Sequence, residues 1–253
     1  MCTLTLAWQV FVDAPLVVAA NRDELADRPS EPPARIDSDP AVVAPRDAQA
    51  GGTWIGYNEH GVFAGVTNRW VVGLAAERSR GLLVREALRR PDAESAVRYV
   101  ERAVDDDAYD GFNLVVADET AAFLLEWDGR LSVTPLDPGV HVVVNVGAAL
   151  GGGGALTDSF FTPQERPERG QAQAENARAV RTALTPEPGE DADSWLDRAR
   201  VVLGDHDYGV CVHEDGYGTR SSSLLRFGAD GVRYWFASGP PCETPFEPVE
   251  SQV

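Results

Sequence analysis

The chain opens with two apolar runs, at residues 3–8 and 16–20, with the turn residues Asp13-Ala14-Pro15 between them. This arrangement predicts a β-hairpin. Residues 51–57 and 62–68 flank a polar turn and predict a second hairpin. Further apolar runs with polar turns between them predict strands at residues 112–117, 121–127, 131–135, 140–145, 224–227 and 232–236.

Apolar residues recur at helical spacing in four other stretches. Asp92 is a candidate N-cap for one of them. Residues 26–50 are rich in proline, aspartate and alanine and are predicted to form a loop, and the glycines at 151–154 are predicted to begin a flexible one. The helices are predicted at residues 81–90, 93–104, 172–184 and 193–203.

The order of these elements predicts the fold class. Strands in antiparallel hairpins that alternate with paired helices indicate an α+β fold, in which two antiparallel sheets pack face to face with helix pairs outside. No linker divides the chain, so residues 1–237 are predicted to form a single domain. Residues 238–253 contain four prolines and are predicted to form a C-terminal tail.

Charge narrows the range of partners. The net charge is −18, and all 22 basic residues are arginine because the chain contains no lysine. Such an acidic chain repels phosphate backbones, so no nucleic-acid partner is expected. The acidic residues are spread along the chain, which is typical of the acidic proteome of a halophilic organism, and a cytoplasmic location is expected. No apolar run is long enough to span a bilayer, and no signal peptide is predicted.

Cys2 is the strongest candidate for catalysis. If Met1 is removed, the Cys2 thiol lies beside an α-amine, which has a pKa near 7.7–8.0 in model peptides. That amine can take the thiol proton, as in N-terminal nucleophile enzymes. A cysteine after the initiator methionine is nevertheless often incidental, so the interpretation depends on the residues around it.

The first hairpin is predicted to bring Asn21, Arg22 and Asp23 back beside Cys2. Arg22 could lower the pKa of the thiol, and Asp23 could hold the α-amine by a charge-assisted hydrogen bond. Taken alone, these residues are also typical of an ordinary polar turn. Asn68 and Asn145 each end an apolar run, where catalytic groups tend to emerge. Arg220 follows a glycine-rich turn and is either a charge at the mouth of the site or a solvated arginine.

No metal site and no cofactor are predicted. The three cysteines, Cys2, Cys211 and Cys242, are widely spaced and odd in number, which argues against a disulfide framework. His206, Cys211 and His213 cluster in the sequence, but their spacing matches no usual zinc pattern and a structural site needs a fourth ligand. The alternative is a polar turn followed by a strand.

Several motifs together resemble the NRDE family, the transport-and-Golgi-organisation type-2 proteins. More distantly the chain resembles the choloylglycine hydrolases and penicillin V acylases. The resembling motifs are Met1-Cys2-Thr3-Leu4, Asn21-Arg22-Asp23-Glu24, Arg46-Asp47 with Gly51-Gly52-Thr53-Trp54-Ile55-Gly56, Gly61-Val62-Phe63-Ala64 with Thr67-Asn68-Arg69, and Tyr217-Gly218-Thr219-Arg220-Ser221.

The resemblance implies a four-layer αββα N-terminal nucleophile hydrolase fold with Cys2 as the nucleophile. It also implies that Asn21 and Asp23 orient the amine, that Asn68 and Asn145 receive the oxyanion, and that Arg220 is the late arginine of the hydrolases. One departure is Ala20, which stands where the hydrolases carry an arginine.

The function expected from the residues and the resemblance is hydrolysis of a C–N amide bond, or of an acyl thioester, in a small-molecule substrate. The alternative is a non-catalytic protein on the same fold that binds or traffics a ligand of the haem or lipid type. Eukaryotic NRDE members are discussed in haem and lipid handling, which favours the alternative. Few histidines are present to ligate haem, although a Cys2 thiolate could do so.

Overall fold

The computed structural model describes residues 2–152 and 155–250. The chain divides into two compact units. The first unit is discontinuous and contains residues 2–28 and 137–250, and the second unit contains residues 29–136. Each unit has one antiparallel sheet and two α-helices among these residues.

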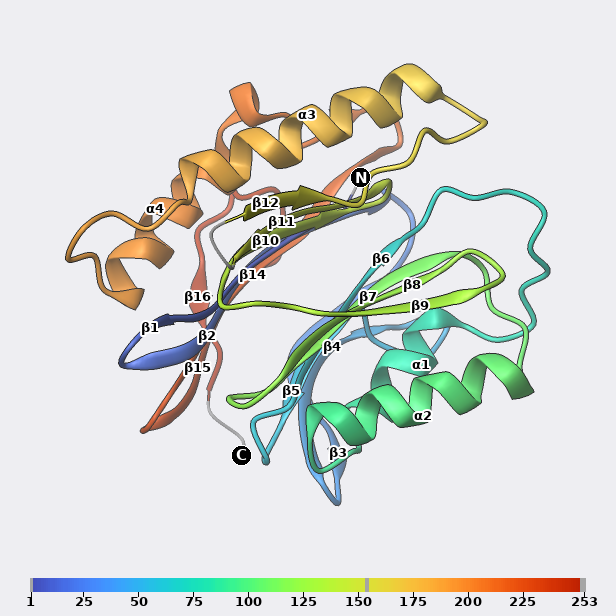
Figure 1. The fold of residues 1–253 in the computed structure, drawn as a ribbon, viewed down its shortest axis with the longest axis horizontal. Helices are drawn as coiled ribbons and strands as arrows, with labels where there is room; N and C mark the ends of the chain where they lie inside the picture. The colour runs from blue at the N-terminus through green and yellow to red at the C-terminus, as the bar shows by residue number, and fades with distance from the viewer. Residues whose placement is uncertain (1, 153–154, 251–253) are drawn as a thin grey trace. The chain divides into compact units, whose positions relative to one another are not determined.

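The sheet of the first unit has nine strands in the described part of the chain. Their order is β12-β11-β10-β1-β2-β14-β15-β16, and β13 pairs with β14 (Figure 1). The strands are β1 Thr3–Phe11, β2 Ala14–Leu25, β10 Gly139–Val144, β11 Gly147–Gly152, β12 Ala155–Asp158, β13 His213–Glu214, β14 Tyr217–Gly228, β15 Gly231–Ala237 and β16 Glu247–Pro248.

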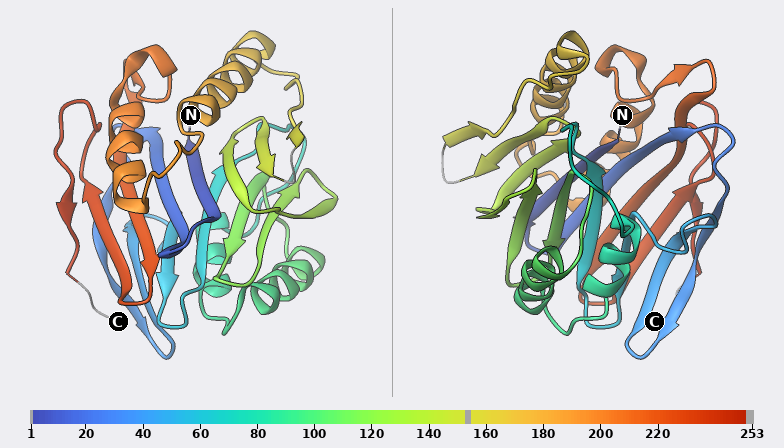
Figure 2. Two further views of the ribbon diagram at one scale, coloured as in Figure 1. Left: turned by 60° about the vertical axis from the view of Figure 1, so that its left-hand side comes forward. Right: turned by 90° about the vertical axis from the view of Figure 1, so that its right-hand side faces the viewer.

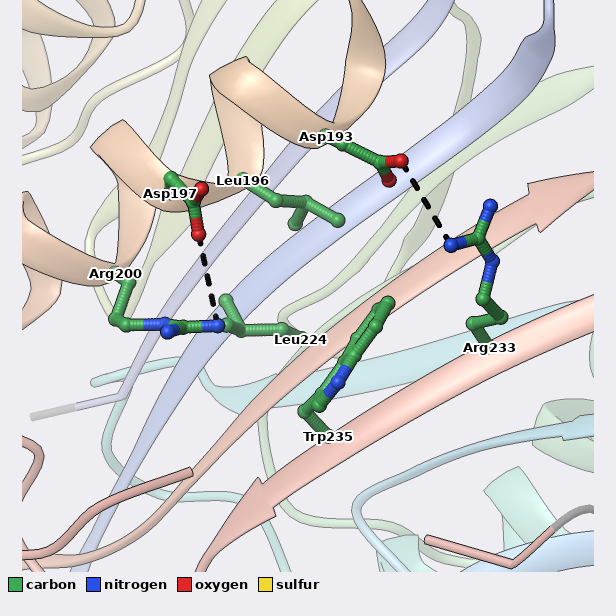
Figure 3. A pocket seen from close by; sticks show the side chains of 7 residues that line it. All are labelled: Asp193, Leu196, Asp197, Arg200, Leu224, Arg233 and Trp235. Atoms are coloured by element: carbon green, nitrogen blue, oxygen red, sulfur yellow. Dashed lines mark ion pairs between the residues drawn. The ribbon is translucent and has the colours of Figure 1, made fainter. Parts of the chain in front are cut away.

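Two helices cover this sheet, α3 Pro167–Ala183 and α4 Ala192–Gly204 (Figure 2). Proline at the first helical position is compatible with the start of α3, because the missing N–H has no partner there in any case. The carboxylate of Asp191 caps α4 by accepting from Ser194 N at 2.8 Å. The buried face of α4 includes Trp195, and α4 also borders the β14–β15 hairpin (Figure 3).

The sheet of the second unit has seven strands in the order β3-β4-β5-β6-β7-β8-β9 among the residues described. Helices α1 Arg80–Ala87 and α2 Ala93–Asp106 pack their apolar faces against it around a core of valine, leucine and alanine. The strands are β3 Ser30–Ser38, β4 Ala41–Asp47, β5 Ile55–Asn58, β6 Phe63–Asn68, β7 Phe112–Ala117, β8 Ala122–Trp127 and β9 Leu131–Pro135.

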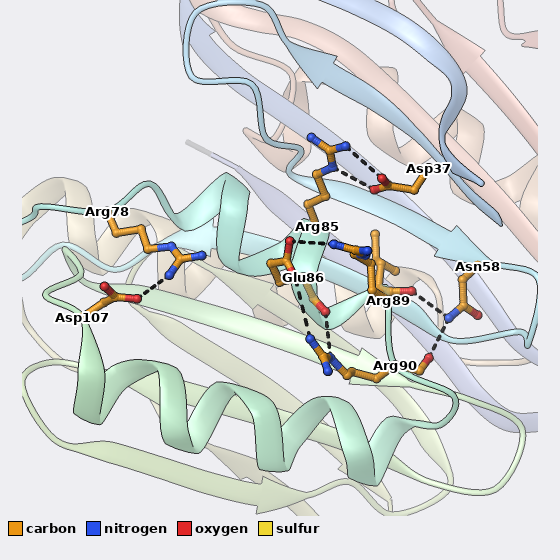
Figure 4. A network of polar contacts seen from close by, with 9 residues as sticks. Asp37, Asn58, Arg78, Arg85, Glu86, Arg89, Arg90 and Asp107 are labelled. Atoms are coloured by element: carbon orange, nitrogen blue, oxygen red, sulfur yellow. Dashed lines mark hydrogen bonds and ion pairs between the residues drawn. The ribbon is translucent and has the colours of Figure 1, made fainter. Parts of the chain in front are cut away.

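Polar side chains join α1 to this sheet (Figure 4). Asn58 Nδ2 donates to the carbonyl oxygens of Leu88 and Arg90, at 2.7 and 2.8 Å, beyond the C-terminal end of α1. Arg85 of α1 makes a two-pronged ion pair with the Asp37 carboxylate of β3, at 2.8 and 2.9 Å. The Arg85 hydrogen bonds hold the pKa of Asp37 below its usual value.

The predicted loop at residues 26–50 is wrong, because β3 and β4 occupy most of it. The loop was predicted because this segment is rich in proline. Pro32 and Pro33 lie in β3, which is the edge strand of its sheet, at a point where the register with β4 shifts between Glu31 and Ala34. Edge strands and bulges are the positions where a sheet tolerates proline.

The flexible loop predicted to begin at residue 151 is wrong for residues 151–152 and 155–158, whereas residues 159–166 form no helix or strand. Strands β11 and β12 form a hairpin there, and residues 153–154 lie outside the described residues. Glycines suit this hairpin because neighbouring backbone approaches closely: a Cβ atom at Gly151 would lie 2.7 Å from the Val140 carbonyl oxygen.

The α+β class with two antiparallel sheets and helix pairs is confirmed. The division into a domain at 1–237 and a tail at 238–253 stays a prediction. Within that tail, β16 pairs with β15, and Val249 N donates to Tyr234 O at 2.8 Å. Among the described residues, no helix combines the length and the apolar character needed to cross a membrane.

His141 makes the stability of the first unit depend on pH. It is buried in β10, and burial lowers the pKa of its imidazole to about 4. Nε2 lies 2.9 Å from the Asp137 carbonyl oxygen, so it carries the proton, and Nδ1 has no partner among the described residues. A proton added at Nδ1 is therefore a buried charge with no acceptor.

We expect His141→Gln to reduce the acid sensitivity of the protein. The unfolded histidine titrates near pH 6.5 and the folded one near 4, so its stabilising contribution is complete above pH 6.5 and is lost as pH falls toward 4. The difference corresponds to about 3 kcal/mol. Urea unfolding at pH 4, 5 and 7 measures it, with His60→Gln at an exposed position as the control; equal acid sensitivity in the His141 variant contradicts the assignment.

Candidate active site

The β1–β2 hairpin places Cys2 beside two other strands. β1 lies between β2 and β10, with Thr3 opposite Asn21 and Leu4 opposite Val143. Continuing this register by one or two residues sets Cys2 opposite Arg22 on one side and Asn145 on the other. The Cys2 thiol donates to the Asp23 carbonyl oxygen at 3.7 Å. The hairpin thus brings Cys2 and Asp23 together.

The surroundings of the Cys2 thiol hold it in the neutral form at neutral pH. Burial raises the pKa of the thiol above its ordinary value. The Asp23 carboxylate raises this pKa further, whereas the Arg22 guanidinium lowers it. A nucleophilic attack from Cys2 therefore requires a base that removes the thiol proton.

Asn145 bonds to the backbone nitrogen of Cys2. It lies in the turn between β10 and β11 and is buried. Its Oδ1 accepts from Cys2 N at 3.1 Å and from Gln173 Nε2 at 2.9 Å. Because the backbone nitrogen can only donate, the carboxamide is turned with its oxygen toward Cys2. The turn requires Gly147, which has a φ of 117° and a backbone packed against Ser159.

Asp23 is held by a residue that the sequence did not single out. Thr219 Oγ1 in β14 donates to Asp23 Oδ1 at 2.5 Å and accepts from Val212 N at 2.9 Å. Burial raises the pKa of the Asp23 carboxyl, and the Thr219 hydrogen bond lowers it. Thr219 lies in the motif at residues 217–221 that carries the family resemblance. This motif was the sequence signal that could have identified Thr219 as a site residue.

Asn21 joins β2 to the helical side of its unit. Its Nδ2 donates to the carbonyl oxygens of Leu203 and Val210, both at 2.9 Å, and its Oδ1 accepts from the Ser222 hydroxyl. These bonds account for the position of the buried carboxamide in β2. The predicted role of Asn21 in orienting an amine stays a prediction.

The two candidate arginines of the first unit differ in burial. The Arg22 side chain is 6% exposed and lies 3.5 Å from the Glu24 carboxylate. Arg220 is exposed, and it occupies a β-bulge where β14 slips by one residue against β2. The bulge lies opposite Arg22 and Asp23, since Thr219 pairs with Asp23 and Ser221 with Arg22. Of these two arginines, Arg22 is therefore the one whose charge lowers the pKa of the Cys2 thiol.

Three further residues border this group and were not among the predicted site residues. Gln173 of α3 is buried and bonds to Asn145. The Tyr217 hydroxyl has its pKa raised by burial and then by the charges of Cys2 and Asp23. Arg169 of α3 lies 5.9 Å from the Tyr217 ring, and its charge lowers the pKa of Asp23.

Asn68, the remaining predicted residue, belongs to the second unit. It ends β6, is exposed and pairs with Phe112 of β7. Its predicted role as an oxyanion donor stays a prediction.

A hollow in the first unit has a volume of ≈ 250 Å³. Its lining includes the ion pairs Asp193–Arg233 and Asp197–Arg200, each at 3.7 Å, and the indole of Trp235 (Figure 3). None of the predicted site residues lines it, so it carries no argument about catalysis. Among the described residues, His206, Cys211, His213 and Cys242 form one group that could hold a metal.

Comparison with known proteins gives the family and the fold. Residues 1–237 match the family model described as Transport and Golgi organisation 2. The Bos taurus protein named Transport and Golgi organization protein 2 homolog is 29% identical over 241 residues, covering 85% of this chain and 83% of that protein. The predicted resemblance to this family is confirmed.

Two solved structures show the fold. Penicillin V acylase from Agrobacterium tumefaciens matches with a TM-score of 0.55 at 16% identity, covering 94% of this chain and 83% of that one. The Caenorhabditis elegans ortholog of N-acylethanolamine-hydrolyzing acid amidase matches with a TM-score of 0.56 at 14% identity, covering 88% and 92%. The fold is thus that of the N-terminal nucleophile amidohydrolases, as predicted.

We expect Thr219→Val to destabilise the protein by about 2 kcal/mol, because it removes a hydrogen bond to a buried carboxylate and leaves Val212 N without its acceptor. Thr219→Ser keeps the hydroxyl and is the matched control. Urea unfolding at pH 7 measures both variants. A loss below about 0.5 kcal/mol for Thr219→Val shows that the bond to Asp23 does not form.

We expect Arg22→Gln, but not Arg220→Gln, to slow the alkylation of Cys2. Arg22 lowers the pKa of the thiol, so its removal raises that pKa and reduces the thiolate fraction at a fixed pH. Iodoacetamide labelling followed by peptide mass spectrometry measures the rate constant at Cys2 between pH 7 and 9. The reverse order of effects assigns the tuning to Arg220.

Proposed function

This chain belongs to the Transport and Golgi organisation 2 family, and on that premise we propose that it is an N-terminal cysteine hydrolase that cleaves a C–N amide bond, or an acyl thioester, of a small molecule. The observation that carries the proposal is the position of the Cys2 nitrogen. It lies 3.1 Å from Asn145 Oδ1, while the thiol of the same residue lies against Asp23. The amidohydrolase fold supports the proposal.

The proposed chemistry begins with the loss of Met1, which turns the Cys2 nitrogen into an α-amine. In its neutral form this amine takes the thiol proton, a step that is needed because burial raises the pKa of the thiol. The Asn145 oxygen accepts one amine hydrogen and orients the nitrogen. The buried Asp23 carboxylate stabilises the ammonium that results, and Thr219 holds this carboxylate in place.

The thiolate sulfur then attacks the substrate carbonyl carbon and forms a C–S bond. The ammonium returns its proton to the leaving nitrogen as the C–N bond breaks, or to the leaving sulfur when the substrate is a thioester. A water molecule, deprotonated by the same amine, attacks the thioester formed on Cys2 and releases the carboxylic acid and the thiol. The Asn145 oxygen faces Cys2, so its Nδ2 is the atom of this side chain able to donate to the oxyanion.

The test distinguishes the role of the Cys2 thiol from the role of the α-amine. We expect the chain that begins at Cys2 to hydrolyse members of a panel of N-acyl p-nitroanilides and acyl thioesters, whereas Cys2→Ala loses activity on the order of 10³-fold or more. A chain with one glycine added before Cys2 keeps the thiol but displaces the amine, so it loses activity to a similar degree. Val12→Ser, at the exposed turn after β1, is the control variant with activity retained.

Intact mass spectrometry of the mature protein establishes whether Met1 is absent. Retained Met1 in the active protein, or full activity in the glycine-extended chain, contradicts the amine as base. If no substrate of the panel is turned over while an apolar ligand binds equally well to Cys2→Ala and to the parent chain, the binding-protein alternative replaces the hydrolase.

A further inference from the structure

A second cluster of reactive side chains lies in the first unit, beside the residues that support Cys2. His206, Cys211, His213 and Cys242 each offer one ligand atom, and these atoms all lie within 4.8 Å of one another. We propose that this cluster is a structural zinc site of the two-cysteine, two-histidine type. The sequence predicted no metal because the first three residues lack a fourth ligand, and the fold supplies it from the C-terminal segment.

The spacing of three of the donor atoms, those of Cys211, His213 and Cys242, fits a tetrahedral ion. Cys211 Sγ lies 3.5 Å from Cys242 Sγ, and His213 Nε2 lies 3.1 Å from Cys242 Sγ and 3.6 Å from Cys211 Sγ. Zinc–sulfur and zinc–nitrogen bonds of about 2.3 and 2.0 Å place the ligands of a tetrahedral site about 3.3–3.8 Å apart. The His206 and His213 rings lie nearly parallel, with centroids 5.1 Å apart.

Local structure brings the four ligands together. The short 3-10 helix η1 His206–Tyr208 is capped by Asp205, whose carboxylate accepts from Asp207 N. Gly209 ends η1 with a φ of 62°, the left-handed conformation that glycine adopts without strain. The chain then passes through Cys211 to His213 of β13, which pairs with β14.

Cys242 arrives on a turn in which the backbone nitrogens of Glu243 and Thr244 donate to Pro240 O, at 3.0 and 2.9 Å. This turn packs against the end of α4, where a Cβ atom at Gly204 would lie 3.3 Å from Cys242 N. Three of the ligands therefore precede β14 in the sequence, and the fourth, Cys242, follows it. An ion at this position would tie the C-terminal segment to the segment at residues 206–213.

The donor set identifies the class of metal and its role. Thiolate with imidazole selects zinc over magnesium or calcium, which prefer oxygen ligands. Four protein ligands fill a tetrahedral shell and leave no position for a substrate or an activated water, which is the arrangement of structural sites and not of catalytic ones. The exposure of His206, His213 and Cys242 gives the ion a route of entry.

The zinc site would act on the Cys2 site through the backbone between its ligands. Val210 O accepts from Asn21 Nδ2, and Val212 N donates to the Thr219 hydroxyl that holds Asp23. Both backbone groups lie between His206 and His213. Zinc bound at these residues would restrict the segment that supports Asn21 and Asp23.

Metal analysis of the full-length protein tests the site. The protein is purified under reducing conditions without a polyhistidine tag, incubated with Zn²⁺ and dialysed, and its zinc content is measured by mass spectrometry. We expect one zinc per chain, and a large loss of zinc in Cys242→Ser and His206→Ala. Cys2→Ser is the matched control: it removes a cysteine outside the cluster and keeps the full zinc content, so the test is independent of the hydrolase proposal.

Cobalt substitution identifies the ligands. We expect Co²⁺ to give the intense visible bands of a tetrahedral ion and a thiolate-to-cobalt charge-transfer band, which is reduced in Cys242→Ser. No zinc in the reduced, folded protein overturns the proposal, as does a zinc content that is unchanged in Cys242→Ser. A Cys211–Cys242 disulfide found by peptide mapping of protein purified with Zn²⁺ under the same reducing conditions also overturns it, in favour of a redox pair.

Discussion

The pairing of β1 with β2 and β10 is the constraint on which the rest of the first unit depends. β1 is an inner strand whose residues 3–8 are buried, so its register is strongly specified: a slip by one residue would turn every side chain to the opposite face. The same register determines what surrounds Cys2. One neighbouring strand presents Arg22 and Asp23, and the turn after the other presents Asn145. The position of Cys2, the candidate nucleophile, therefore follows from the pairing of β1 with its two neighbouring strands.

Around the β1–β2 hairpin, buried polar groups form a hydrogen-bond network. Gln173 of α3 bonds to Asn145, Thr219 of β14 bonds to Asp23, and the backbone of residue 212 bonds to Thr219. Helix α3 and strand β14 thus each contribute a polar side chain to the site. Buried polar groups are costly when unpaired, so this network specifies one arrangement of the site.

The predictions from the sequence were most accurate for elements whose structure depends on the residues of a single segment. The first hairpin, the four helices and the strands at 112–135 follow from local periodicity and were correct to within a few residues. The sequence failed where the reason lies in distant packing. Pro32 and Pro33 suggested a loop because nothing local shows that β3 is an edge strand. Gln173 and Thr219 were missed for the same reason, since each is an ordinary polar residue until the fold sets it against Asn145 or Asp23.

The discontinuous first unit sets an order of events during synthesis. Cys2 leaves the ribosome long before Asn145, Gln173 and Thr219, and β1 cannot pair with β10 until the whole second unit has been made. At about 5–20 residues per second this interval lasts many seconds. During that time Asn145 is not yet present to bond to the Cys2 nitrogen, although β1 can already pair with β2. Afterwards the Cys2 nitrogen bonds to Asn145, so the removal of Met1 that the proposed mechanism requires would precede this bond if it takes place on the nascent chain.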